Sequence, residues 1–172
     1  MRDQVDLLAV ASEVLDRMAN GGVLCNVVDG TGRANTLTIG WGLIGRGYHD
    51  HPVVAIAITP LRYSWRFVEE VPEFVLSVPD AGCLRPALDL CGSASGRDLD
   101  KFAAAGLTLV PSIDVRPPSI REFPLNVECR VYTKVAPPHF LLTPEHRQRP
   151  IEHQHTIYFA EVLGAYRWQG EA

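Results

Sequence analysis

The chain has 172 residues, of which 47% are hydrophobic and 21% charged, a composition typical of one globular domain with a buried core. Its formal net charge of −4 gives no electrostatic basis for nucleic-acid binding. No apolar run approaches the roughly 20 residues of a membrane span, and the N-terminus lacks the basic-then-apolar order of a signal peptide. We therefore expect one domain over residues 1–172 that binds neither nucleic acid nor a membrane.

The chain contains four cysteines, at positions 25, 83, 91 and 129, and none of them forms a C-x-x-C pair. Without a secretion signal, this pattern predicts free thiols in a reducing cytoplasm. Their spacing also argues against a zinc site. We therefore expect a cytoplasmic protein that binds no metal.

Apolar periodicity and turn signals predict a chain with many strands and few helices. In chain order, we expect a helix at 3–19, strands at 23–28, from 35 and at 53–58, a helix at 60–71, a strand at 73–79, helices at 84–90 and 96–105, and strands at 107–116, 125–135 and 156–168, the last bent at Gly164. The strands lack regular βαβ alternation, which favours a closed antiparallel barrel with helices attached. Residues 1–20 would hold the N-terminal helix and 22–168 the barrel. Residues 136–154 form a long irregular segment, and such loops are usually functional or disordered.

The strand that starts at Asn35 has two chemically different faces. Thr36 and Thr38 share one face, and Leu37 and Ile39 share the other, because side chains alternate along a strand. A face that can form hydrogen bonds beside an apolar face suits a flat ligand with a polar tail. The alternative is a half-buried strand whose threonine face lies in solvent.

Three glycines in the same stretch, Gly40, Gly42 and Gly45, match the dinucleotide-binding pattern G-x-G-x-x-G. That motif requires a helix directly after the glycines, with its N-terminus at the pyrophosphate. Gly47 and Pro52 prevent a helix there, so we reject a Rossmann interpretation. The glycines instead indicate a bend in the strand or a close approach to its backbone.

Two arginines, Arg62 and Arg97, fall in the first turns of predicted helices, where the helix dipole disfavours a cation by roughly 0.3–1 kcal/mol. An anion bound at those helix ends would reverse this preference, since it would accept hydrogen bonds from backbone N–H groups and from the guanidinium groups. Ser64, Ser95 and Lys101 could add donors. Two such segments converging on one phosphate would form a phosphate site.

The alternative is that nearby carboxylates neutralise the two arginines in solvent. Asp98 and Glu69 or Glu70 are the candidates. Exposed ion pairs contribute little to stability, so nothing in the sequence forbids this arrangement.

Taken in order, these segments resemble the flavin reductase-like family of FMN-binding split β-barrels, the flavoredoxin-like group. The matching segments lie between residues 22 and 165, at 35–42, 52–56, 62–64, 73–78, 91–92, 95–102 and 125–129. Members of this family often carry Gly-Asp-His before the last strand, whereas this chain has His153-Gln154-His155, so only His155 matches.

The resemblance implies a mainly β, antiparallel Greek-key split barrel with FMN as cofactor, near the interface of a homodimer. It implies that the first segment cradles FMN through Asn35, Thr36, Leu37, Thr38 and Trp41. It implies that the phosphate is held by Arg62, Ser64, Ser95, Arg97 and Lys101.

The resulting hypothesis is an NAD(P)H-dependent flavin reductase, in which hydride passes from reduced nicotinamide to FMN and electrons leave to an acceptor. The alternatives are a non-enzymatic FMN electron carrier or redox sensor reduced by a protein partner, and a barrel that has lost flavin and serves as a structural dimer. No catalytic acid or base is assigned. Four histidines, His139, His146, His153 and His155, lie on the irregular segment without fixed metal-ligand spacing and are interpreted as solvated surface residues.

Overall fold

The structure is a computed structural model that describes residues 1–47, 50–144 and 149–169. The strands are β1 (Arg2–Gln4), β2 (Val23–Val28), β3 (Ala34–Ile39), β4 (Gly42–Arg46), β5 (Pro52–Ile58), β6 (Glu73–Val78), β7 (Leu109–Val110), β8 (Ser119–Ile120), β9 (Leu125–Val135) and β10 (Thr156–Trp168). The helices are α1 (Ala11–Ala19), α2 (Tyr63–Glu70), α3 (Arg85–Ser93) and α4 (Lys101–Ala104), with 3₁₀ turns at Leu7–Ala9 and Ile151–His153. None of the described helices is long and apolar enough to cross a membrane.

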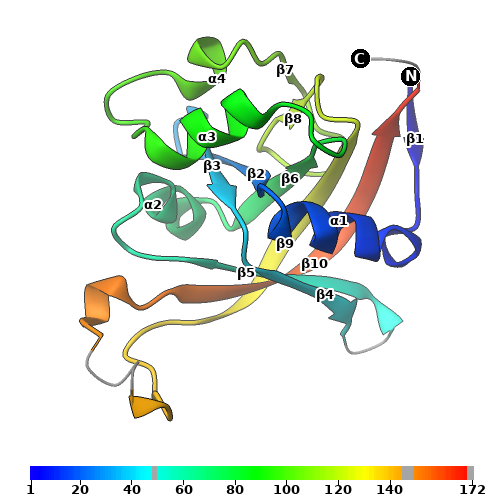
Figure 1. The fold of residues 1–172 in the computed structure, drawn as a ribbon. Helices are drawn as coiled ribbons and strands as arrows, with labels where there is room; N and C mark the ends of the chain where they lie inside the picture. The colour runs from blue at the N-terminus through cyan, green and yellow to red at the C-terminus, as the bar shows by residue number, and fades with distance from the viewer. Residues whose placement is uncertain (48–49, 145–148, 170–172) are drawn as a thin grey trace.

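One antiparallel sheet organises the molecule, with strand order β3-β2-β6-β9-β10-β5-β4 and β1 added to β10 (Figure 1). Strands β3 and β4 stand at opposite ends of this order, yet only Gly40 and Trp41 separate them along the chain. The sheet must therefore curl until its two ends meet, which makes it a split barrel. A small β7–β8 ribbon lies apart from this sheet. The mainly antiparallel β fold predicted from sequence is confirmed.

The predicted bend in the last strand lies at Gly164, as the pairing of β10 with β9 shows. The register shifts between Val162 and Gly164, and a Cβ on Gly164 would lie 2.4 Å from the Tyr166 hydroxyl. A β-bulge of this kind increases strand curvature. The glycine therefore lets one 13-residue strand curve around the barrel.

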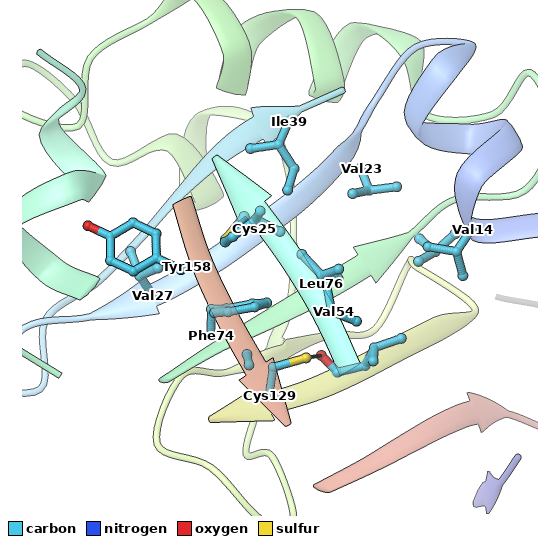
Figure 2. Packing of buried hydrophobic residues seen from close by; sticks show 14 of the residues in the cluster. Val14, Val23, Cys25, Val27, Ile39, Val54, Phe74, Leu76, Cys129 and Tyr158 are labelled. Carbon is cyan, nitrogen blue, oxygen red and sulfur yellow. Dashed lines mark hydrogen bonds between the residues drawn. The ribbon is translucent and has the colours of Figure 1, made fainter. Parts of the chain in front are cut away.

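The barrel interior is filled by apolar side chains from both halves of the sheet and from α1 (Figure 2). Those labelled are Val14, Val23, Cys25, Val27, Ile39, Val54, Phe74, Leu76, Cys129 and Tyr158. Fully burying one such aliphatic or aromatic side chain contributes roughly 1.5–3 kcal/mol. Burial also raises the pKa of the thiols of Cys25 and Cys129, so both behave as small apolar residues. All four cysteines are free, as the sequence predicts.

A second, smaller apolar cluster lies on the outer side of β2, beneath α3 and α4. Leu24, Leu88, Cys91, Phe102 and Phe123 form its centre. This packing places α3 over the threonine face of β3, and the two elements are in contact. The threonine face is therefore covered by a helix, and the alternative of a solvent-exposed face is wrong for this strand.

A chain of buried polar side chains crosses four neighbouring strands. Thr36 on β3 donates to the Asn26 amide oxygen at 2.8 Å, and Asn26 on β2 donates to Ser77 at 2.8 Å. Ser77 on β6 donates to the Asn126 amide oxygen at 2.6 Å, and Asn126 on β9 exchanges hydrogen bonds with the backbone of Ile120. Since an unpaired buried polar group costs about 1–3 kcal/mol, each strand is fixed in register by its neighbour.

The predicted N-terminal helix at 3–19 is wrong in its first half. Residues 2–4 form β1, in register with β10, and the backbone N–H of Val5 donates to the Ala165 carbonyl at 2.9 Å. Asp6 then caps a 3₁₀ turn, and α1 begins only at Ala11. Helical periodicity was misleading here because an edge strand of the barrel supplied backbone partners that the sequence does not show. Residues 1–20 thus contribute both a strand of the sheet, β1, and the helix α1.

Two predicted helices start later than expected. Helix α2 begins at Tyr63, with Arg62 as its N-cap, instead of at Pro60. Helix α4 covers only Lys101–Ala104, because the Asp100 carboxylate accepts from the N–H groups of Phe102 and Ala103 and so becomes the cap in place of Ser95. The predicted strand at 107–116 is reduced to β7. In contrast, β2, β9 and β10 have the predicted bounds.

The glycines of the β3–β4 corner permit a close approach, as predicted. A Cβ on Gly42 would lie 2.7 Å from Sδ of Met18 on α1 and 3.3 Å from the Ala55 carbonyl oxygen. We expect Gly42→Ala to lower the free energy of unfolding by about 1–2 kcal/mol through overpacking, measured by urea denaturation. Gly45→Ala is the matched control, since its Cβ would meet nothing within 4 Å. Equal changes for the two variants would contradict this explanation.

Candidate functional site

A small recess lies where the first turn of α2, the last turn of α3 and the turn at residues 95–98 meet β3. Its volume is about 120 Å³, the size of one phosphate-like group with its surroundings. Seven of the residues predicted to bind cofactor line it: Leu37, Thr38, Arg62, Ser64, Ser95, Arg97 and Lys101. The tertiary structure therefore brings together segments that are more than 60 positions apart in the sequence.

Lys101 forms the buried floor of the recess, with only 5% of its surface exposed. Its ammonium group donates to the carbonyl oxygens of Thr36 and Cys91, at 2.8 Å each. Burial lowers the pKa of Lys101, the Cys91 side chain opposes this effect, and the positive charge of Arg62 lowers the pKa further. An ammonium group has three donors, so two carbonyls leave one N–H for a ligand. A bound anion would offset the desolvation of this charge.

The opposite wall is held by a contact between Asn35 and Gly96. The Asn35 amide donates to the Ser64 hydroxyl at 2.9 Å, and both side chains are buried. A Cβ at position 96 would lie 2.2 Å from the Asn35 amide oxygen. Only glycine permits the turn at residues 95–98 to approach β3 this closely, so Gly96 is part of the construction of the recess.

A cluster of arginines surrounds the ring of Tyr63 at the mouth of the recess. The guanidinium carbons of Arg97 and Arg66 each lie 4.7 Å from the ring centroid, and that of Arg33 lies 5.9 Å away. Arg33 also donates to the Gly96 carbonyl at 3.0 Å. Cation–π contacts stabilise each guanidinium group by about 0.5–1 kcal/mol at exposed sites. The cluster gives the mouth of the recess a strong positive potential.

The proposed neutralisation of Arg62 and Arg97 by nearby acids is not what the structure shows. Glu69 pairs with Lys134, and Glu70 accepts from the backbone N–H of Gly30. Among the described residues, no carboxylate forms an ion pair with Arg62 or Arg97.

Of the two arginines predicted in first helical turns, only Arg62 lies at a helix end. It is the N-cap of α2, one position before the first turn that the structure shows. Arg97 precedes α4 by four residues and lies in a turn in which its own N–H donates to the Ser95 hydroxyl at 3.2 Å. Its interaction with an anion would therefore depend on its charge and on the turn, without a helix dipole.

A broad open cleft of about 890 Å³ continues from the recess. Leu37, Thr38, Leu61 and Arg62 border both spaces, so the two form one continuous site. The cleft is also lined by Gly40 and Trp41 at the end of β3 and by Ala57 and Ile58 on β5. A site with a small cationic end and a wide, partly apolar end fits an elongated ligand with an anionic tail and a flat ring system.

Of the ten residues predicted from sequence to bind the cofactor, nine line the site or support its wall through their side chains, and one does not. Eight line the recess or the cleft, and Asn35 stands directly behind the wall through Ser64. The exception is Thr36, whose hydroxyl points into the buried polar network and whose carbonyl oxygen instead holds Lys101. Sequence reasoning gave no role to Arg33, which follows the β2–β3 turn and carries no local signal. Tyr63, on whose ring the arginines pack, was included in the family resemblance at residues 62–64 but was given no role.

A side cavity of about 400 Å³ opens from the cleft behind Trp41. His139, Arg149 and His155 line it together with apolar residues. Burial, and then electrostatic interaction with Arg149, Arg62 and His139, lower the pKa of His155, which favours its neutral form. Within the described ranges no group of three or more metal-ligating side chains occurs, and His146 lies outside the described residues.

Comparisons with known proteins agree with this geometry. The family model described as the flavin reductase like domain matches residues 15–171. An uncharacterized protein of Pyrococcus abyssi is 33% identical over 147 residues, which are 85% of this chain and 73% of that protein. The flavoredoxin of Desulfovibrio vulgaris superimposes with a TM-score of 0.69 at 24% identity, over 87% of this chain and 70% of that one. An NADH:FAD oxidoreductase of Streptomyces globisporus gives a TM-score of 0.65 at 20% identity, over 96% and 87%.

The curled antiparallel sheet, with a cationic recess beside an open cleft, is a split barrel, the fold that it shares with the Desulfovibrio vulgaris flavoredoxin. Since the family model covers most of its length, the chain belongs to the flavin reductase-like family. Family membership supports a flavin-binding redox function.

Lys101 should contribute to folding as well as to the site. We expect Lys101→Met to lower the free energy of unfolding by about 1–3 kcal/mol, because the carbonyls of Thr36 and Cys91 lose their donor in a buried position. Chemical denaturation measures this change. Lys134→Met is the matched control: Lys134 is half-exposed in a surface ion pair with Glu69, and its loss should cost about 1 kcal/mol or less. A Lys101 variant as stable as the Lys134 variant would contradict this role.

Proposed function

We propose that the protein is an FMN-dependent oxidoreductase that takes hydride from NADH or NADPH and passes electrons to an acceptor. The observation that carries the proposal is the recess with Lys101 at its floor and Arg62 and Arg97 at its edge, continuous with a cleft wide enough for a ring system. Cations without carboxylate partners around a space the size of a phosphate favour an anionic ligand.

The choice of FMN follows from the size of the recess. At about 120 Å³, it accommodates one phosphate group and closes against the contact between Asn35 and Gly96. The ribityl chain would pass Thr38, and the ring would lie in the cleft between Trp41 and the β5 residues. Thr38 already donates to the Leu88 carbonyl at 2.5 Å, so its oxygen remains available as an acceptor. The residues present thus fit the cofactor.

When bound, the flavin would supply the redox chemistry by accepting hydride and passing on electrons. The residues of the chain would bind and orient it. Arg62, Arg97 and Lys101 would anchor the phosphate, while Leu37 and Trp41 would limit movement of the ring. The lowered pKa of His155 favours the neutral imidazole beside the cleft.

A non-enzymatic electron carrier is the second candidate. The specific observation in its favour is the exposure of two large apolar residues. Leu61, which borders the cleft, is 51% exposed, and Phe140, which lies between the side-cavity residues His139 and Leu141 in the chain, is 90% exposed. A redox partner could dock on such a surface. The third hypothesis, a barrel without flavin, is disfavoured because the cationic recess is intact.

The proposal includes a homodimer in a reducing compartment such as the cytoplasm. A groove of about 490 Å³ on the outer face of the barrel, lined by Leu43, Val53, Ala55, Tyr132 and Phe159, supports an interface there. The four unpaired thiols support the compartment.

The anion-binding role of Arg97 can be tested by comparing two flavins. We expect Arg97→Ala to weaken FMN binding about 10- to 100-fold, as expected for loss of a charged hydrogen bond worth about 1.5–3 kcal/mol. Riboflavin, which lacks the phosphate, should bind both proteins equally. Quenching of flavin fluorescence on titration with the apoprotein measures each affinity. Arg116→Ala, at an exposed arginine between β7 and β8, is the control and should bind FMN normally. Full FMN affinity in Arg97→Ala would refute the assignment.

The donor is tested by anaerobic addition of NADH and then NADPH to the FMN-loaded protein. We expect the visible flavin absorption to bleach with at least one nucleotide, because the cleft leaves room beside the ring. Bleaching by neither nucleotide, with reduction by dithionite intact, would select the carrier.

A further inference from the structure

The side cavity behind Trp41 is lined by apolar side chains and by one permanently charged residue, Arg149. Trp41, Ala57, Leu141 and Ile157 supply the apolar surface. Trp41 is 45% exposed and borders both this cavity and the open cleft, as do Ala57, Arg149 and His155. A molecule in the side cavity would therefore lie directly beside one in the cleft.

Most polar groups that line the side cavity form hydrogen bonds with one another or with the backbone around it. Gln154, which is 7% exposed, accepts from the His139 backbone N–H at 2.8 Å and donates to the Arg149 carbonyl oxygen at 3.2 Å. The His139 ring nitrogen Nε2 lies 2.5 Å from the His155 carbonyl oxygen. These contacts join His139 to Gln154 and His155, and they hold the backbone of Arg149 at the cavity edge.

Among the described residues that line the side cavity, Arg149 carries a permanent positive charge. No aspartate or glutamate lines the side cavity or the cleft among the described residues. The lowered pKa of His155 favours its neutral form. Arg62 borders the cleft and the recess but does not line the side cavity, and its guanidinium group lies 3.4 Å from the Gly92 carbonyl oxygen. In a partly apolar space, a planar guanidinium group favours a carboxylate or similar anion that accepts two parallel hydrogen bonds.

We propose that the side cavity binds a small planar aromatic anion, with Arg149 contacting its carboxylate and Trp41 packing against its ring. An anion of this class that also carries a quinone would serve as the acceptor of the reductase, a role that rests on the proposed function. The quinone would take up two electrons from the reduced cofactor and two protons, and become the hydroquinone. Binding of the anion is argued from the geometry of the side cavity, so that Arg149 and Trp41 would select the substrate class and the recess the cofactor.

A pair of ligands that differ only in charge tests the proposal. We would titrate 2-naphthoate and 2-naphthamide into the full chain by calorimetry, first without flavin and then saturated with FMN. We expect naphthoate to bind about tenfold more tightly than naphthamide. Arg149→Ala should reduce this preference to less than about twofold. Arg149→Lys, which keeps the charge and loses the planar fork, should be intermediate.

Two control variants locate the effect. Arg116→Ala removes an equivalent surface charge and should leave the preference unchanged. Arg97→Ala, in the recess, should also leave it unchanged. Equal binding of the two ligands, binding of neither, or a preference that survives in Arg149→Ala or disappears in Arg97→Ala would overturn the proposal.

Failure of the proposed function is recognised separately in the same titrations. A protein that binds naphthoate through Arg149 but does not bind FMN supports the side cavity and refutes the flavin reductase. A protein that binds FMN and shows no charge preference supports the flavin site and refutes the side cavity.

Discussion

The buried ammonium group of Lys101 is the interaction on which the site depends. It projects from α4 and holds β3 through the Thr36 carbonyl and the last turn of α3 through the Cys91 carbonyl. A buried charge is costly unless it is paired or fully hydrogen-bonded. Two carbonyls satisfy part of that requirement, and an anion in the recess would satisfy the remainder. Folding and binding of an anion would be coupled at this residue, because the same group joins β3 to α3 and lines the recess.

A similar constraint sets the strands behind the recess. The network from Thr36 through Asn26 and Ser77 to Asn126 replaces apolar packing with hydrogen bonds that have one satisfactory register. A slip of one residue would leave several buried polar atoms unpaired. The network thus fixes β3, and with it the position of Leu37 and Thr38 at the edge of the cleft.

The distribution of charge separates the site from the rest of the molecule. The chain is acidic overall, with a formal net charge of −4. Yet Arg33, Arg62, Arg66 and Arg97 gather around one end of the site, and Arg149 stands at the other. Long-range attraction of anionic ligands to the site would therefore act against the overall charge of the protein. The side chains around Tyr63 would favour a phosphate at one end of the site, and Arg149 would favour a planar anion at the other.

The sequence by itself determined the fold class, the long strands and most of the site. Runs rich in β-branched and aromatic residues predicted β2, β9 and β10 with their bounds, since such residues favour strands locally. The order of the matched segments identified eight residues that line the recess or the cleft. Features that depend on residues distant in the chain became visible in the folded structure. β1 formed in place of a helix because β10 offered an edge, and Asp100 displaced Ser95 as a helix cap. The Thr36 hydroxyl points into the buried network because it donates to the facing Asn26. Arg33 lies beside the site because its guanidinium group packs on the Tyr63 ring. These outcomes depend on contacts between residues far apart in the chain, and no local pattern encodes them.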